Sequence, residues 1–387
     1  MQLNEDQRMI QDMVRAFAAA ELQPLAAQVD EQARFDPGVL QKLAAVNLLG
    51  LLAPAEVGGA GVDYATFTLA IEEVARVCGS TALLLVTHNA LGAAAIAMHG
   101  SAALREAWLG RCARGEAIAA FAWTEPDAGS DSGVLQTTAE LQGDEDWVLN
   151  GTKNAVSCAA VADCFLVAAR ETGAGADASN LGLWLVEKTA PGLTVDPHAD
   201  TLGLRAAGLT GLRLDQVVVG PDNRLGVRRM EELQRLLDGA RIAIGALAVG
   251  IAEAGLERAL RYARERPQFV TSIVEHQSVQ LRLADAAADT HAARLVVHEA
   301  ARAYDAREPV ARLAATAKLF ATEAATRVCD HAIQVHGGYG YCTEYHVERS
   351  YRDAKMCEVA YGPSDLQRFV IVREMVREAD AGWALLQ

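Results

Sequence analysis

The pattern of apolar residues changes twice along the chain, from helical to strand-like and back, and this order constrains the fold more than any other feature. Before about residue 115 and after Pro221, apolar side chains recur at helical spacing among Ala, Leu, Arg and Glu. Between these parts, short apolar or alternating runs are separated by Gly, Asp, Asn and Pro, which is typical of strands and turns. The sequence therefore predicts a β segment flanked by two helical ones.

The boundaries of these parts define three expected domains. We expect an α+β chain with an all-helical domain at 1–116, a β domain at 117–226 and a helical domain at 227–387. The βαβ alternation of a doubly wound sheet is missing, as are the glycine fingerprints of Rossmann and P-loop nucleotide sites. Gly58-Gly-Ala-Gly61 follows no strand and is expected to be a turn between helices. Asn150-Gly151 suggests a hairpin turn.

Charge and cysteine content limit the compartment and the partners. Asp and Glu outnumber Lys and Arg by 50 to 35, a formal net charge of −15, which argues against a nucleic-acid partner. Seven cysteines without a C-x-x-C pair indicate neither a disulfide framework nor a zinc knuckle. The N-terminus is acidic and lacks the pattern of a secretory signal. We therefore expect a reduced, cytoplasmic protein.

The stretch 77–104 carries no formal charge and is long enough to cross a bilayer. Polar side chains at its centre, Thr87, His88 and Asn89, would be costly to leave unpaired in lipid. We therefore expect a helix buried in the core of the protein rather than a membrane span.

Four short segments gather polar residues and glycines in otherwise apolar surroundings. Such turns offer hydroxyls and free backbone N–H groups to an anionic ligand and let it approach the backbone closely. His276 and His336 lie within two of them, but no further His or Cys stands at ligand spacing, so no metal site is expected. The segments are 123–131, 149–157, 264–277 and 334–340.

Eight segments together carry a resemblance to a known family. They are Pro54–Gly61, Thr124–Asp131, Asn150–Lys153, Leu202–Arg205, Leu237–Arg241, Arg266–Gln277, Gln334–Gly340 and Val347–Lys355. In their order and spacing they resemble the acyl-CoA dehydrogenase family over essentially the whole chain.

This resemblance implies a fold, a cofactor and a reaction. The fold has an N-terminal helical domain, a middle β-barrel-like domain and a C-terminal four-helix bundle. The cofactor is FAD, and the activity is an oxidoreductase reaction at the α,β bond of an acyl thioester of CoA or a carrier protein, in the oxidative or the reductive direction. The implied partners are an electron-transfer protein and further copies of the chain, as a homodimer or homotetramer.

The resemblance also maps the family's binding positions onto this sequence. Three groups of residues fall where the family contacts the flavin and its diphosphate, a neighbouring subunit's FAD, and the adenosine end of FAD. These are Thr124, Gly129, Ser130 and Ser157; Arg266, Phe269 and Gln277; and Gln334, Gly337 and Gly338. The positions that contact the thioester are Ser130, Asp238, Arg241 and Gly362.

The chain departs from the family at the catalytic base. Tyr361 stands at the position of the family's glutamate, and Pro363 stands at the position of its threonine. In some members the glutamate comes from another helix, where this chain has Ala240. Neither position is acidic, and the nearby Glu358 and Asp365 are expected to be solvated charges.

Other positions differ from the family or have two interpretations. Ala155 replaces an aromatic residue that covers one flavin face, and Val270 replaces a glycine after Phe269. His88 and Asn89 fall near the implied acyl pocket, where a hydrogen-bonded core pair is at least as good an interpretation as a substrate contact.

Without an acidic base, three functions remain open. Tyr361 is a poor base, because a tyrosine of pKa about 10 is almost entirely protonated at neutral pH, whereas dehydrogenation requires removal of an α-proton. The first function is the acyl-thioester oxidoreductase, with Tyr361 as a proton donor or a pocket filler. The second is a lyase or another non-redox thioester enzyme with structural FAD. The third is a non-catalytic subunit of a heteromeric dehydrogenase.

Overall fold

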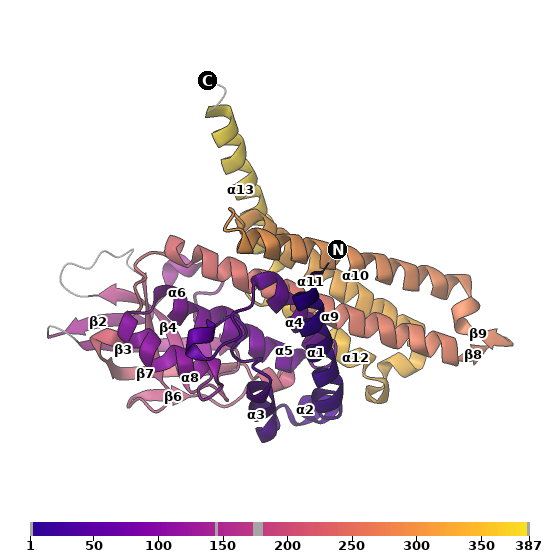
Figure 1. Ribbon diagram of the computed structural model, residues 1–387, viewed down its shortest axis with the longest axis horizontal. Helices are drawn as coiled ribbons and strands as arrows, with labels where there is room; N and C mark the ends of the chain where they lie inside the picture. The colour runs from indigo at the N-terminus through magenta and orange to yellow at the C-terminus, as the bar shows by residue number, and fades with distance from the viewer. Residues whose placement is uncertain (1–2, 144–145, 173–180, 385–387) are drawn as a thin grey trace.

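The N-terminal helices lie between the sheet and the long C-terminal helices and contact both (Figure 1). The structure is a computed structural model that describes residues 3–143, 146–172 and 181–384. The chain enters α1 through a capping box between Asn4 and Gln7. The helical elements of the N-terminal part are α1 (Glu5–Phe17), η1 (Ala18–Leu22), α2 (Ala26–Gln32), α3 (Pro37–Ala45), η2 (Ala55–Val57), α4 (Tyr64–Ala75), α5 (Gly79–Leu85), η3 (Val86–Ala93), α6 (Ala94–His99), α7 (Ala102–Leu104), η4 (Arg105–Leu109) and α8 (Gly110–Ala113).

The uncharged stretch forms one helix through α5, η3 and α6, and it is buried. Two helices in the described part of the chain, Gly79–His99 and Met230–Glu265, are long and apolar enough to cross a membrane, but most of each lies inside the protein. His88 accepts a hydrogen bond from the Ala119 N–H and its other ring nitrogen lies 3.1 Å from the Cys112 carbonyl, while burial lowers its pKa to about 4. Asn89 donates to two backbone carbonyls. Both are hydrogen-bonded core residues.

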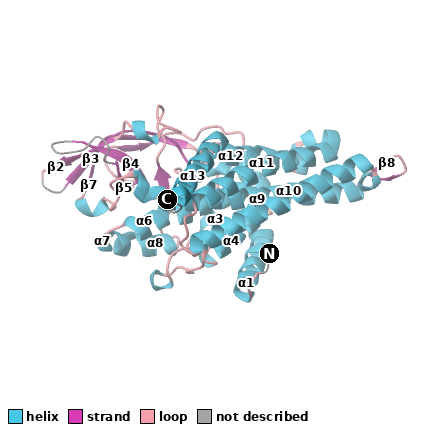
Figure 2. Cartoon of the chain, turned by 90° about the horizontal axis from the view of Figure 1, so that it is seen from above, coloured by secondary structure: helices cyan, strands magenta, loops and turns pink. Residues whose placement is uncertain are grey.

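The middle of the chain folds into a curled seven-stranded sheet (Figure 2). Its order is β1-β4-β2-β3-β7-β6, with β5 paired to β4. Two register shifts in the pairing of β3 with β7 mark bulges, which bend a strand and increase its twist. The strands are β1 (Ala119–Ala122), β2 (Thr138–Gln142), β3 (Asp146–Val156), β4 (Cys164–Thr172), β5 (Leu181–Glu187), β6 (Leu193–Val195) and β7 (Thr210–Val219).

The hairpin expected at Asn150-Gly151 is wrong, because both residues lie within β3. Gly151 has φ 150°, and a Cβ there would come within 2.6 Å of the Thr137 hydroxyl, so the glycine allows a neighbouring strand to approach. The Asn150 side chain accepts a hydrogen bond from the Gln216 N–H on β7. The dipeptide therefore marks a bulge rather than a chain reversal.

The C-terminal part is a bundle of long helices built around α9. Helix α9 packs against α4, α10, α11 and α12, and α13 projects away from the rest of the molecule (Figure 1). The short hairpin of β8 and β9 lies at the end of the bundle far from the sheet (Figures 1 and 2). The elements are α9 (Gln234–Glu265), β8 (Pro267–Gln268), β9 (Thr271–Ser272), α10 (Gln277–Asp305), α11 (Ala311–His336), α12 (Val347–Val359) and α13 (Ser364–Ala384), joined by the short turns η9 (Ile273–Glu275), η10 (Gly337–Tyr341) and η11 (Thr343–Tyr345). The α+β class and its helix–sheet–helix order are confirmed.

Candidate active site

A cavity of about 450 Å³ lies where the curled sheet, the first turns of α9 and the α12–α13 turn meet. Its wall is mostly apolar and includes the stacked rings of Phe121 and Trp123, whose centroids are 5.9 Å apart. Seven of the predicted site residues line it, although they come from distant parts of the sequence. These are Thr124, Gly129, Ser130, Ser157, Arg241, Tyr361 and Gly362.

The loop that carries Thr124 and Ser130 is held by a buried ion pair. The Lys153 ammonium lies 2.7 Å from Glu125 Oε1 and also donates to the Trp123 carbonyl. Burial alone would raise the pKa of Glu125, but hydrogen bonds from Lys153, Thr137 and Gln136 outweigh it, so the pKa is lowered. Burial lowers the pKa of Lys153 to about 8. The Lys153–Glu125 ion pair therefore fixes the loop to β3, a role that was not predicted from the sequence.

Tyr361 lies in a strained turn between α12 and α13. Its φ is 56° and that of Gly362 is 91°, in the left-handed region that few non-glycine residues adopt. The Gln367 amide donates to the Gly362 carbonyl at 2.8 Å, and the Lys318 ammonium donates to the Glu358 carbonyl at 2.7 Å. These two buried side chains hold the turn, and the sequence alone gave no sign of either role.

The Tyr361 hydroxyl is hydrogen-bonded to the Thr87 hydroxyl at 2.9 Å. Burial raises the pKa of Tyr361 to about 12, and the contact with Thr87 lowers it only in part. Near neutral pH the side chain is therefore an uncharged phenol that can donate a proton but is a very weak base. Thr87 belongs to the polar group within the uncharged helix, but the residues expected near the acyl pocket were its neighbours His88 and Asn89.

Among the described residues that line the cavity, none carries a carboxylate. Asp365 is exposed and pairs with Arg368, as expected. Glu358 was expected to be solvated, and this is wrong: its side chain is only 16% exposed and is held by Lys355 at 2.7 Å and by Thr326. Neither acid faces the cavity, and Ala240 lines it as a methyl group.

Arg241 brings a positive charge to one side of the cavity. Its guanidinium lies 2.5 Å from Asp238 Oδ1, and its buried Nε has no hydrogen-bond partner. Burial raises the pKa of Asp238, although Arg241 and Gln234 favour its charged form. Asp238 itself does not line the cavity, so it acts on this space through Arg241.

The remaining six predicted FAD residues lie at the other end of the bundle, near the β8–β9 hairpin. All are exposed, and none lines the cavity. The Arg266 guanidinium lies 5.4 Å from the centre of the Tyr339 ring, so this surface joins two segments that are distant in sequence. One chain therefore does not bring the two groups together. The six are Arg266, Phe269, Gln277, Gln334, Gly337 and Gly338.

The local backbone at both ends leaves room for a bound group. A Cβ added at Gly129, Gly337 or Gly338 would meet no atom within 4 Å. Ala155 lines the cavity with a methyl group where the resemblance implies an aromatic ring. At the hairpin, Val270 has φ 77° and is fully exposed, a strained conformation for a β-branched residue. The residues present fit a long cofactor with a phosphate-bearing end.

Comparison with known proteins covers nearly the whole chain. Family models described as the N-terminal, middle and C-terminal domains of acyl-CoA dehydrogenase match residues 4–116, 120–217 and 230–376. Over 379 residues the chain is 41% identical to the probable acyl-CoA dehydrogenase YngJ of Bacillus subtilis, which covers 97% of this chain and 99% of that protein.

Two solved structures show how closely the backbone agrees. The butyryl-CoA dehydrogenase from Megasphaera elsdenii matches with a TM-score of 0.94 at 30% identity, over 97% of this chain and 99% of that one. The acyl-CoA dehydrogenase from Bacillus anthracis, complexed with FAD, matches with a TM-score of 0.92 at 29% identity, over 98% of this chain and 68% of that one. Because the three domain models match in order and the Bacillus subtilis relative is matched almost to its full length, this chain belongs to the acyl-CoA dehydrogenase family.

Proposed function

We propose that the protein is an FAD-dependent oxidoreductase that acts on the α,β bond of an acyl thioester of CoA or of a carrier protein. The observation that carries this proposal is the cavity of about 450 Å³, which collects the hydroxyls of Thr124, Ser130 and Ser157 around one space with Arg241 and Tyr361. This volume lies in the usual range of small-molecule sites. Bound FAD supplies two-electron chemistry at the β-carbon of the acyl chain.

The state of Tyr361 favours the reductive direction. Reduction of an enoyl thioester adds a hydride to the β-carbon and a proton to the α-carbon, and a neutral phenol can donate that proton. Oxidation instead requires a group that removes the α-proton, and the described lining residues offer no carboxylate for this. The Thr87 hydroxyl, at 2.9 Å, keeps the phenol oriented.

A second candidate is a non-catalytic subunit of a heteromeric dehydrogenase. Two observations favour it: the cavity lacks a carboxylate, and the exposed residues around Arg266 and Phe269 can contribute to a cofactor site in a companion chain.

We also infer that copies of the chain assemble, as a dimer or tetramer. This is supported by the separation of the two groups of FAD positions and by the exposed apolar side chains of α13, among them Phe369 and Val372. An electron-transfer protein would exchange electrons with the flavin. All seven cysteines are free thiols, which supports a cytoplasmic, reducing location.

Arg241→Gln tests the thioester site. Because Arg241 lines the cavity while pairing with Asp238, its loss should weaken binding of a CoA thioester about tenfold or more, with little change in FAD content. Calorimetry with a panel of saturated and enoyl thioesters measures the affinity. Anaerobic mixing with the same panel, followed at the flavin absorbance bands, shows whether the protein oxidises or reduces the thioester. The matched control is Arg229→Gln, whose side chain is 72% exposed. Equal binding by wild type and Arg241→Gln would remove Arg241 from the site.

Arg266→Ala tests the shared cofactor site. A charge-assisted hydrogen bond to a diphosphate contributes roughly 1.5–3 kcal/mol, so the variant should bind FAD about tenfold more weakly or worse. Arg266 is exposed, so the fold should be unaffected. Release of fluorescent FAD during serial dilution gives the affinity, and Arg264→Ala, an exposed neighbour two residues away, is the control. If Arg266→Ala retains FAD as well as Arg264→Ala does, the assignment is wrong.

A further inference from the structure

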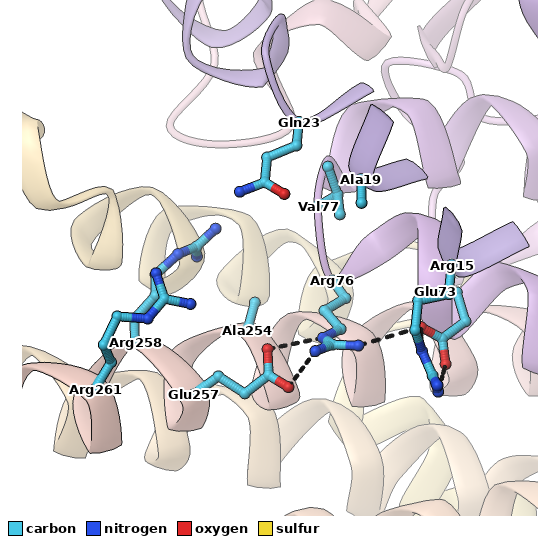
Figure 3. Close-up of a pocket in the computed structure, with 10 residues that line it drawn as sticks. All are labelled: Arg15, Ala19, Gln23, Glu73, Arg76, Val77, Ala254, Glu257, Arg258 and Arg261. Atoms are coloured by element: carbon cyan, nitrogen blue, oxygen red, sulfur yellow. Dashed lines mark hydrogen bonds and ion pairs between the residues drawn. The ribbon is translucent and has the colours of Figure 1, made fainter. Parts of the chain in front are cut away.

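A second, smaller cavity lies between α9 and the N-terminal helices (Figure 3). Its volume is about 310 Å³, and it shares no lining residue with the cavity of the candidate active site. Helix α1 contributes Arg15, and η1 and the residue after it contribute Ala19 and Gln23. The end of α4 and the residues after it contribute Glu73, Arg76 and Val77, and α9 contributes the rest. The α9 residues are Ala254, Glu257, Arg258 and Arg261.

Two of the four arginines in this cavity are neutralised by its two carboxylates. Arg15 Nη2 lies 2.8 Å from Glu73 Oε1, and Arg76 Nε lies 2.8 Å from Glu257 Oε2. Arg76 also reaches Glu73 at 3.4 Å, so both carboxylates are fully engaged (Figure 3).

The other two arginines have no carboxylate partner. Within the part of the chain that the structure describes, no carboxylate oxygen lies within 4.0 Å of the guanidinium of Arg258 or Arg261. The cavity therefore carries an excess of two positive charges, although the chain as a whole carries −15. In an acidic protein such a local excess is not a consequence of composition.

Arg258 is also partly buried. Burial, together with the nearby charge of Arg349, lowers its pKa to about 10, and its one hydrogen bond is donated to the Ser350 hydroxyl at 2.6 Å. Arg349 is only 8% exposed, and its buried Nη1 has no hydrogen-bond partner. Glu257 and Asp353 favour the charged form of Arg258 from a distance, but neither carboxylate forms an ion pair with it, so a bound anion would stabilise this arrangement.

We propose that this cavity binds a phosphate-type oxyanion, held between the guanidinium groups of Arg258 and Arg261. The planar donor fork of arginine matches the oxygens of a phosphate, and the Gln23 amide extends into the same space from the opposite side (Figure 3). The volume admits either free phosphate or a small phosphate monoester. This site is independent of the proposed thioester chemistry.

Phosphate binding to the FAD-loaded protein tests this proposal. Inorganic phosphate and glycerol 3-phosphate should each raise the midpoint of thermal unfolding in a saturable way, beyond the effect of sodium chloride at equal ionic strength. Arg261→Gln, at an exposed position that should not disturb folding, is expected to weaken the affinity about tenfold. Arg213→Gln, an exposed position on β7, is the matched control and should respond as wild type does.

Further variants separate the possible outcomes. Arg258→Gln should lose the phosphate response yet be at least as stable as wild type in phosphate-free buffer, because it removes a partly buried cation that has no ion-pair partner. Tighter binding of glycerol 3-phosphate would identify an organic monoester as the ligand and tighter binding of phosphate the free ion, and both support the site. A response that is absent, that equals the effect of chloride, or that is lost in Arg241→Gln but kept in Arg261→Gln would overturn it.

Discussion

Tyr361→Glu is expected to increase the rate of α-proton removal from a saturated acyl-CoA by a factor of about 10² or more. With a phenol pKa of about 12, roughly one Tyr361 side chain in 10⁵ is ionised at pH 7, whereas a carboxylate at this position is ionised at or slightly above neutral pH. Placing a general base within reach of the proton typically contributes 10²- to 10⁴-fold. Anaerobic bleaching of the flavin by butyryl-CoA and deuterium exchange at the α-carbon measure the gain.

Two controls show whether charge or shape is responsible. Tyr361→Gln has nearly the shape of the glutamate variant without its charge and should gain nothing. Tyr361→Phe keeps the ring but loses the hydroxyl that contacts Thr87, so it should lower enoyl-thioester reduction if the phenol donates the proton. Burial should raise the pKa of the new carboxyl group, so the oxidation rate of Tyr361→Glu should rise with pH through that value.

The wild type provides the decisive comparison. Oxidation of butyryl-CoA by wild type at an ordinary rate of about 10 per second would show that another group acts as the base. Absence of both oxidation and reduction in the wild type, with activity restored by a companion chain, would support the non-catalytic subunit instead.

Lys153→Met is expected to lower the free energy of unfolding by about 3–5 kcal/mol. The substitution leaves the Glu125 carboxylate buried without its counter-charge, which is among the largest effects of a single substitution. Urea unfolding monitored by tryptophan fluorescence measures the loss. The same variant should bind FAD more weakly, because the loop with Thr124 and Ser130 loses its anchor at the Trp123 carbonyl.

Two further proteins test the cause. The double variant Glu125→Gln with Lys153→Met removes both charges and should recover much of the lost stability. Lys42→Met breaks an ion pair with Glu21 in which both side chains are 43% exposed, and it should cost no more than about 1 kcal/mol. Equal losses for Lys42→Met and Lys153→Met would show that burial of the pair does not matter.

The order of helices and strands was predictable because it depends on local periodicity, which survives in a single sequence. Seven of the positions that line the cavity followed from the resemblance to the acyl-CoA dehydrogenase family, which rests on short motifs such as the one that contains Thr124 and Ser130. Contacts between distant residues could not be predicted in this way: nothing near Thr87 in the sequence indicates that it meets Tyr361, which lies 274 residues further along.

Two wrong expectations have the same physical origin. Asn150-Gly151 has the composition of a hairpin turn, but pairing with β7 keeps the dipeptide inside a strand. Glu358 has the charge of a surface residue, but Lys355 and Thr326 partner its carboxylate and permit its partial burial. In each case tertiary contacts outweigh the local preference.

Helix α9 fixes the relative positions of three proposed sites. It carries Arg241 of the candidate active site and both Arg258 and Arg261 of the second cavity, and Arg266 near the β8–β9 hairpin follows its last residue. At 1.5 Å per residue, Arg241 and Arg258 are about 25 Å apart along one axis. Inserting a single residue between them would turn one by about 100° relative to the other, because the helix has 3.6 residues per turn. Insertions and deletions can therefore be accommodated in the surface loops, but within α9 they would change the distance and the orientation between these arginines.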